Sequence, residues 1–266
     1  MLKGIDISNW QNGLNLNKVK NIDFCIVKAT EGLNFVDYTC DGFVQTCIKK
    51  GMPWAFYHFA KYNDPLREAE FFVKACENYF GDGIPVLDYE VENWNDKLWC
   101  EQFITRVHDL TGIWCMLYTS ASWCAKFKDS WIANKCALWV AGYPYPMENW
   151  PDGGCPYDCT PWKRCTIWQF TDCLLTYFGN IDGDIAYISI DEWVKYAQGK
   201  ISNATEKQET APAEKGKTCE ELAQEVLQGK WGNGWNRQQA LDAAYGVGTY
   251  DHVQCIVNQL MGLDGC

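Results

Sequence analysis

Short apolar runs alternate with amphipathic stretches along the first 196 residues of the chain. The amphipathic stretches contain helical spacing at residues 65–79, which follow Asp64 as an N-cap, and at residues 95–110. The apolar runs have the length of buried strands. They predict eight strands, near residues 3–7, 23–29, 53–59, 84–89, 113–118, 137–141, 165–170 and 184–188.

Alternating strands and helices are typical of an α/β fold with a parallel sheet. Eight such strands favour a parallel barrel, which usually needs about 250 residues. The segment that holds them here is shorter, so we expect some outer helices to be missing or reduced, mainly between residues 119 and 184. An open doubly wound sheet is the structural alternative.

The pattern changes towards the end of the chain. Residues 199–217 are rich in Lys, Glu, Ala, Thr and Pro, which predicts a linker. Thr218 and Glu221 then form a capping box at the start of a helix over residues 218–228. Two more helices are predicted near residues 236–245 and 251–261. We therefore expect a barrel at residues 1–198, a linker at 199–217 and a small three-helix bundle at 218–266.

Composition and charge narrow the class of partner. The chain is 47% hydrophobic and 21% charged, as in an ordinary globular protein. Its formal charge of -11 disfavours nucleic acid, because binding to phosphates needs a basic surface. The sequence has neither a run of about 18 apolar residues nor the pattern of a secretory signal. We expect no membrane insertion and no secretion by the usual route.

The 15 cysteines are an odd number in a long chain without a secretory signal, which favours reduced, mostly buried thiols. Four of them, Cys155, Cys159, Cys165 and Cys173, lie close together in the sequence. Structural zinc prefers paired ligands at tight spacing, and only Cys155 and Cys159 satisfy it. The spacing therefore favours a loop of free thiols over a metal site. We expect no metal and no cofactor.

Active sites of parallel barrels lie where the strands end. Here the predicted strands end mostly in acidic residues, among them Asp6, Glu31, Asp88 and Glu90. Asp88 and Glu90 are two positions apart, so on a strand their side chains leave the same face. Such a pair can supply a proton donor and a charged group, as cleavage of a glycosidic bond requires. The alternative is a capped strand whose acids pair with a solvated base such as Lys97.

Aromatic residues are abundant, with 14 tryptophans and 14 tyrosines. Flat aromatic faces can cover the apolar faces of sugar rings, so this content favours a carbohydrate substrate. Trp139 and Trp168 lie near predicted strand ends and are candidates for a cleft. Simple packing in the core is the alternative for each.

With these residues in place, the chain resembles the glycoside hydrolase family 25 lysozymes, the N-acetylmuramidases of phage endolysins and bacterial autolysins. The resemblance covers residues 1 to about 196 and follows the family's order, with a motif at each predicted strand end. The motifs are GIDISNWQ (4–11), VKATEG (27–32), AFYHF (55–59), LDYE (87–90), LYT (117–119), LWVA (138–141), IWQF (167–170) and IDGD (181–184).

The resemblance implies a modified TIM-like barrel with reduced helices and hydrolysis of the β-1,4 bond between N-acetylmuramic acid and N-acetylglucosamine in peptidoglycan. By position, Glu90 is the general acid, and Asp88 orients the 2-acetamido group that attacks the anomeric carbon. Asp6 and Asp182 match the other two acids of the cleft. Asp184 departs from the family, which commonly has Asn there. The implied substrate-binding residues are Glu31, Tyr57, Tyr118, Trp139 and Gln169.

The C-terminal segment resembles the seventh-type cell-wall-binding repeat of phage endolysins, through residues 222–234 and 250–258. This resemblance implies that Trp231, Asn233 and Arg237 bind the cell wall. A plain helical turn with Trp231 in a small core is the alternative.

Together the two resemblances imply a phage-type endolysin that is made in the host bacterial cytoplasm and acts on the cell wall after release. The alternatives are a non-catalytic peptidoglycan-binding protein on a degenerate barrel and a related chitinase-like or amylase-like hydrolase. The presence of all four acids disfavours the first, and the wall-binding resemblance disfavours the second. The oligomeric state stays open.

Overall fold

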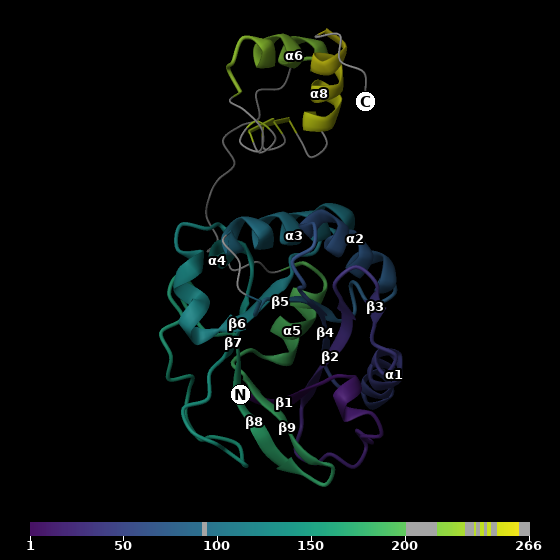
Figure 1. The fold of residues 1–266 in the computed structure, drawn as a ribbon, viewed down its shortest axis with the longest axis vertical. Helices are drawn as coiled ribbons and strands as arrows, with labels where there is room; N and C mark the ends of the chain where they lie inside the picture. The colour runs from purple at the N-terminus through teal and green to yellow at the C-terminus, as the bar shows by residue number, and fades with distance from the viewer. Residues whose placement is uncertain are drawn as a thin grey trace. The chain divides into compact units, whose positions relative to one another are not determined.

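The computed structural model describes residues 1–91, 95–200, 217–231, 237, 240–241, 244–245 and 249–260, with only the backbone at 251, 252, 258 and 259. The chain divides into two compact units, Met1–Thr205 and Glu206–Cys266 (Figure 1). Among the described residues, no helix combines the length and the apolar character needed to cross a membrane.

The first unit contains a closed barrel of eight strands, as the sequence predicts. Around the barrel each strand pairs with its neighbours, and pairing of the first strand with the second closes the ring. The short strand β3 (Phe35–Val36) lies outside the ring and pairs with the second strand. The barrel strands are β1 (Leu2–Ile7), β2 (Phe24–Glu31), β4 (Trp54–Phe59), β5 (Ile84–Asp88), β6 (Met116–Ser120), β7 (Leu138–Ala141), β8 (Ile167–Thr176) and β9 (Gly179–Ala186).

The last strand runs against the others, which corrects the expectation of a fully parallel barrel. Strand β9 is antiparallel to both β8 and β1. The reason is local: only Tyr177 and Phe178 separate β8 from β9, and a parallel neighbour would need a crossover of about a dozen residues. Because β9 is reversed, residues in its first half lie at the end of the barrel where the parallel strands finish.

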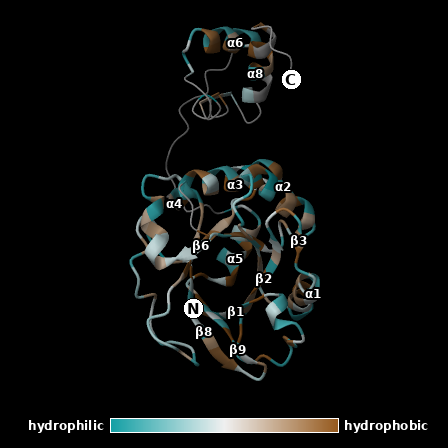
Figure 2. Cartoon of the chain, viewed as in Figure 1, coloured by the Kyte–Doolittle hydropathy of each residue, from teal (hydrophilic) through white to brown (hydrophobic). Residues whose placement is uncertain are grey.

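Helices cover part of the barrel. The two predicted helices appear as α2 and α3, and the Asp64 carboxylate caps α2 by accepting the N–H groups of Leu66 and Arg67 at 3.0 Å each. The described helices between β6 and β9 are short, as expected. Figure 2 shows both hydrophobic and hydrophilic residues on α2 and α3, in keeping with one buried face. The helices are α1 (Cys40–Lys50), α2 (Pro65–Ala75), α3 (Asp96–Thr111), α4 (Ile132–Lys135) and α5 (Ile190–Ala197), with 3-10 turns η1 (Asn9–Gln11) and η2 (Ala121–Phe127).

The side chains inside the barrel change from apolar to polar along the strands. On β5, Ile84 and Val86 point inward at the start and Asp88 points inward at the end, as the period of two requires. Trp193 of α5 closes the starting end by packing against Phe24 with ring centroids 4.9 Å apart. The opposite end is therefore left open and polar.

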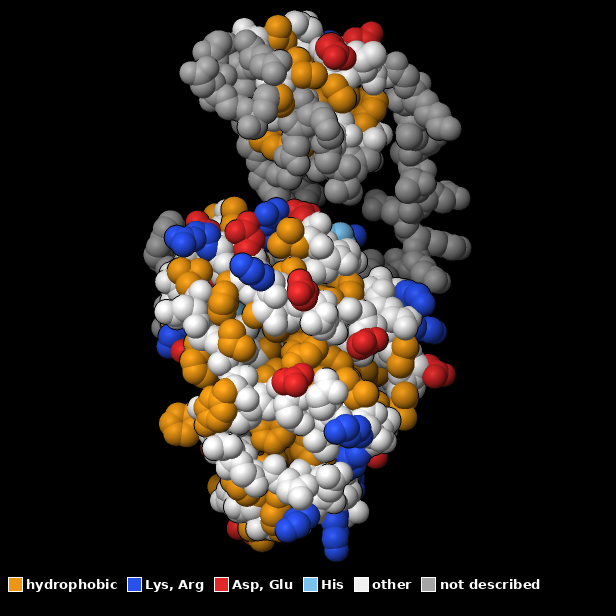
Figure 3. Space-filling view, turned by 90° about the vertical axis from the view of Figure 1, so that its right-hand side faces the viewer, with side chains coloured by type: hydrophobic (Ala, Val, Ile, Leu, Met, Phe, Trp, Pro, Cys, Tyr) orange, Lys and Arg blue, Asp and Glu red, His pale blue; other side chains and the backbone are white. Residues whose placement is uncertain are grey.

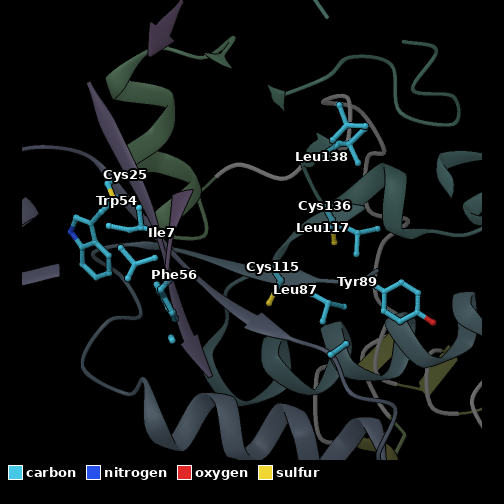
Figure 4. Close-up of a cluster of buried hydrophobic side chains, with 14 of the residues drawn as sticks. Ile7, Cys25, Trp54, Phe56, Leu87, Tyr89, Cys115, Leu117, Cys136 and Leu138 are labelled. Carbon is cyan, nitrogen blue, oxygen red and sulfur yellow. The ribbon is translucent and has the colours of Figure 1, made fainter. Parts of the chain in front are cut away.

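The outward-facing side chains of the strands form the larger hydrophobic core beneath the helices. Figure 4 shows part of it, in which Cys25, Phe56, Leu87 and Leu117 lie on neighbouring strands and Cys115 directly precedes β6. The thiols of this layer are fully buried, as predicted for core cysteines. Alternation along the strands thus separates this core from the barrel interior.

The second unit contains α6 (Cys219–Leu227) and α8 (Thr249–Leu260), whose small core includes Leu222, Val226 and Val253. The predicted capping box is present, with the Thr218 hydroxyl accepting the N–H of Glu221 at 3.3 Å. The middle predicted helix, residues 236–245, lies largely outside the described residues.

Most of the described cysteines are reduced thiols, as expected from the sequence. Thirteen of them form no disulfide. Cys255 of α8 is disulfide-bonded, which corrects the expectation for that residue.

Candidate active site

The open end of the barrel holds a cavity of about 250 Å³. All eight barrel strands and the 3-10 turn η1 contribute side chains to its walls. Strand β2 contributes Lys28, and the other strands contribute mainly acidic, aromatic and amide side chains. Figure 3 shows acidic and hydrophobic side chains interspersed across one face of this unit. The predicted site residues that line the cavity are Asp6, Tyr57, Asp88, Glu90, Tyr118, Trp139, Gln169 and Asp182.

Asp88 and Glu90 share the cavity but differ in their access to water. Asp88 ends β5 and is 5% exposed, and its Oδ1 accepts no hydrogen bond from the described residues. Burial and then the charge of Glu90 raise the pKa of Asp88. Glu90 reaches solvent, yet the surrounding walls remove part of its hydration and raise its pKa, while the charge of Lys28 acts in the opposite direction. Both carboxyl groups are therefore biased towards holding a proton.

A hydrogen-bond network built on Gln169 connects the remaining acids. The Gln169 amide nitrogen donates to Asp6 Oδ2 at 2.8 Å and to Asp182 Oδ2 at 3.4 Å. The hydroxyls of Tyr118 and Tyr143 donate to Gln169 Oε1 at 2.8 and 2.6 Å. The two phenols therefore fix which end of the Gln169 amide faces the acids.

Asp184 lies behind these acids and is fully buried. The indole nitrogen of Trp139 donates to its Oδ1 at 2.8 Å, and its carboxyl group contacts that of Asp6. Burial raises the pKa of Asp184 to about 8 and, with the charge of Asp6, that of Asp182 to about 9. Burial and the charge of Asp184 also raise the pKa of Asp6. Carboxyl groups this close cannot all ionise together, so burial and mutual repulsion bias the three towards holding protons.

Of the catalytic and substrate-binding residues that the resemblance implies, Glu31 is the one that does not line the cavity. Its carboxylate accepts Lys28 Nζ at 2.6 Å and Lys61 Nζ at 3.2 Å. Its partial burial opposes ionisation, but the two lysines outweigh this and lower the pKa of Glu31. Glu31 thus acts on the cavity through Lys28, whose side chain does line it.

Lys28, Trp10 and Tyr143 were not singled out from the sequence. Lys28 occupies an inward-facing position at the end of β2, so the period of two from Ile26 could have identified it. Trp10 is 84% exposed at the cavity mouth on η1. Tyr143 comes from the irregular connection after β7, which offers no periodic signal.

Of the two tryptophans predicted for a cleft, only Trp139 lines the cavity. Trp168 is 2% exposed and faces the outer core, where its indole nitrogen donates to the Gly142 carbonyl oxygen at 2.8 Å. Its cleft prediction is wrong, because the neighbouring residues Ile167 and Gln169 take the inward-facing positions of β8.

The predicted wall-binding residues lie in the second unit. Trp231 is half-buried against Tyr245 and donates to Glu225 Oε2 at 3.1 Å. Arg237 donates to Gln254 Oε1 at 3.0 Å. Asn233 lies outside the described residues.

Both units match known families. The model of glycosyl hydrolases family 25 matches residues 5–176, and the CW_7 repeat matches residues 220–261. Lysozyme M1 of Streptomyces globisporus is 27% identical over 203 residues, which cover 69% of this chain and 66% of that protein. The autolytic lysozyme of Clostridium acetobutylicum is 36% identical over 158 residues, which cover 56% of this chain and 47% of that protein. This chain therefore spans about two thirds of the first relative and about half of the second.

The barrel also matches a solved structure. The catalytic domain of an endolysin from bacteriophage P40 of Listeria monocytogenes is 27% identical, with a TM-score of 0.57. The match covers 74% of this chain and 98% of that domain.

Proposed function

The chain belongs to glycosyl hydrolase family 25, and we propose that it is a muramidase that cleaves the β-1,4 bond between N-acetylmuramic acid and N-acetylglucosamine in bacterial peptidoglycan. One observation carries this proposal: Asp88 and Glu90 open into one cavity, and the pKa of each is raised. A protonated acid beside a second carboxyl group is what hydrolysis of a glycosidic bond requires.

Glu90 is the general acid in this proposal. Its side chain reaches solvent at the cavity mouth, where the oxygen of a bound glycan can approach it. Its raised pKa keeps the proton available for the leaving oxygen. After the leaving sugar departs, the Glu90 carboxylate accepts a proton from the water that completes hydrolysis.

Asp88 acts on the other side of the bond. Its buried Oδ1 accepts no hydrogen bond from the described residues, so an N–H donor from the substrate can bind there. The acetamido N–H of muramic acid is such a donor, and this contact aims the acetamido oxygen at the anomeric carbon. Asp6 and Asp182 face the same space, and the acid of this group that is ionised stabilises the positive charge that develops on the sugar.

The aromatic and amide side chains provide the sugar subsites. Tyr57, Tyr118 and Trp139 pack against one another in the wall of the cavity, with ring centroids of Tyr118 and Trp139 4.3 Å apart. Gln169 presents its amide to the same space, and Glu31 holds Lys28 in place at the edge.

The second unit is a cell-wall-binding module in this proposal, which rests on the match to the CW_7 repeat. Trp231, Asn233 and Arg237 are its binding residues. The protein then acts as a phage-type endolysin, made in the bacterial cytoplasm and active on the wall after release. The likeness to an endolysin domain supports this origin.

Replacing Glu90 with Gln tests the acid assignment. The amide keeps the shape of the side chain and removes the proton, so we expect wall lysis to fall by roughly a hundredfold or more. The matched control is Glu70→Gln, on the outer face of α2, where Glu70 pairs with Arg106 at 2.7 Å. Lysis by Glu90→Gln at the wild-type rate would refute the assignment.

A further inference from the structure

Four thiols from separate segments converge on one side of the barrel, away from the residues assigned to catalysis. The Sγ atoms of Cys155, Cys159 and Cys165 all lie within 4.8 Å of one another. The thiol of Cys124 interacts with that of Cys159 and thus lies beside this group of three. Four sulfur atoms in such a cluster can surround one metal ion.

The fold, not the sequence spacing, brings these residues together. Cys124 lies in η2, Cys155 and Cys159 lie in the connection between β7 and β8, and Cys165 lies two residues before β8. The sequence grouped Cys173 with them, but its thiol contacts Thr171 Oγ1 at 3.0 Å and the Met147 carbonyl oxygen at 3.7 Å. Cys124 therefore takes the fourth place that spacing assigned to Cys173.

The spacing of the sulfur atoms suits a tetrahedral ion. Zinc–sulfur bonds of about 2.3 Å place the sulfur atoms of a site with four cysteine ligands about 3.8 Å apart. The sulfur atoms of Cys155, Cys159 and Cys165 lie within 4.8 Å of one another, so binding would draw them together by at most about 1 Å and bring in Cys124 as the fourth ligand. A disulfide would instead join one pair at about 2.05 Å and leave two thiols over.

The surroundings are those of a closed structural site. Cys124 is 1% and Cys159 7% exposed, and the other two thiols are half-buried. Tyr187 places its buried hydroxyl beside Cys155 and Cys165, where the O–H can donate to a metal-bound sulfur. Thiolates in a tetrahedral, enclosed arrangement favour zinc over magnesium or calcium.

Most of the cluster lies in a long irregular connection of the barrel. Residues 142–166 connect β7 to β8 without a helix or strand. Irregular connections of this length are uncommon in compact domains unless something holds them. The same connection carries Tyr143, whose hydroxyl orients Gln169 in the cavity.

We propose that Cys124, Cys155, Cys159 and Cys165 bind one Zn²⁺ ion, which ties the β7–β8 connection to η2 and to the start of β8. The ion is structural: its four protein ligands leave no open position for a substrate. It holds the connection that supplies Tyr143 and thereby supports the active site from outside.

The first test is metal analysis of the full chain, purified with reducing agent, loaded with zinc and freed of excess metal. We expect one zinc per wild-type chain, loss of that zinc in Cys159→Ser, and full retention in the matched control Cys173→Ser. Equal zinc in Cys159→Ser and wild type would overturn the site, as would wild-type protein that retains no zinc.

The second test needs no variant, so it stands even if Cys159→Ser fails to fold. Cobalt(II) added to the wild-type chain should give intense visible bands of a tetrahedral ion together with sulfur-to-cobalt charge-transfer absorption, and zinc should abolish both. Absence of these bands, a disulfide among the four cysteines by mass spectrometry, or tightly bound iron in place of zinc would overturn the proposal.

Discussion

Asp184 illustrates how one buried carboxyl group can influence the acids of the cavity from behind them. Trp139 donates to its Oδ1, while its Oδ2 accepts no hydrogen bond from the described residues and the group contacts Asp6. Two carboxylates in contact would repel each other, so a proton lies between them. Burial raises the pKa of both groups, and this contact then lowers the pKa of Asp184 and raises that of Asp6, so the shared proton rests on Asp6.

Replacing Asp184 with Asn should extend activity to higher pH. The pKa of Asp184 is raised to about 8 by burial, so its proton is present below that pH and is lost above it, which adds a charge beside Asp6. Asp182, with its pKa raised to about 9, faces the same pair. We expect the alkaline limb of the pH–rate profile to move upward in Asp184→Asn. Superimposable pH–rate profiles for Asp184→Asn and the wild type would show that ionisation of Asp184 does not limit activity at high pH.

The same residue should make stability depend on pH. An acid with a higher pKa in the folded state contributes fully below its unfolded pKa of about 4, and this contribution is lost as the pH rises to about 8. Asp184→Asn removes the loss, so its Tm should decline less than that of the wild type across this window. Parallel Tm curves for the two proteins would argue against a protonated Asp184.

Tyr143 offers a milder test of the network around Gln169. Tyr143→Phe removes one of two donors to Gln169 Oε1, a loss of about 1 kcal/mol, so we expect a rate reduction of roughly fivefold. Tyr145→Phe is the matched control, since Tyr145 is 65% exposed on the same connection. Equal rates for the two variants would show that Tyr118 alone orients the amide.

At the scale of elements, the alternation of side chains explains both what the sequence predicts and what it does not. Apolar runs predict where strands lie, and the acid at the end of β5 predicts the cavity. Hydropathy does not encode direction, so the reversal of β9 follows only from the two-residue turn before it. Cys124 and Tyr143 escape prediction because each reaches its partners through the fold, across many residues of sequence.

A buried hydrogen bond between a neutral histidine and a glutamate should account for much of the attachment of α2 to the barrel, since burial lowers the pKa of His58. Glu68 of α2 accepts His58 Nε2 of β4 at 2.8 Å, and both side chains are fully buried. Because Glu68→Ala leaves the buried His58 imidazole without its hydrogen-bond partner, it should lower the free energy of unfolding by about 1 to 3 kcal/mol. Urea denaturation measures this. Glu70 is exposed on the same helix, so Glu70→Ala should change the free energy of unfolding far less. A similar loss in the two variants would show that the His58–Glu68 contact does not hold α2 to the barrel.

At the scale of the whole molecule, the two units divide catalysis from attachment in our proposal. The barrel contains the complete acidic cavity, and the second unit carries the match to the CW_7 repeat. The family model ends at residue 176, where β8 ends, so Asp182 on β9 lies beyond it. The reversed hairpin nevertheless returns Asp182 to the cavity.

Deleting residues 200–266 should separate the two roles. We expect the shortened chain to sediment much less with purified cell walls and to retain its turnover of small soluble glycan fragments. Full-length Glu90→Gln is the reciprocal control, with normal sedimentation and no turnover. Unchanged sedimentation of the shortened chain would remove the binding role from the second unit.

Identification of the bond that the purified chain cleaves in peptidoglycan tests the central claim most directly. Peptidoglycan digested by the purified chain is reduced, and the new ends are identified by mass spectrometry. The proposed muramidase produces reduced muramic acid at the new ends. Reduced N-acetylglucosamine would contradict the assigned bond, and no new ends from protein that still sediments with walls would contradict catalysis itself.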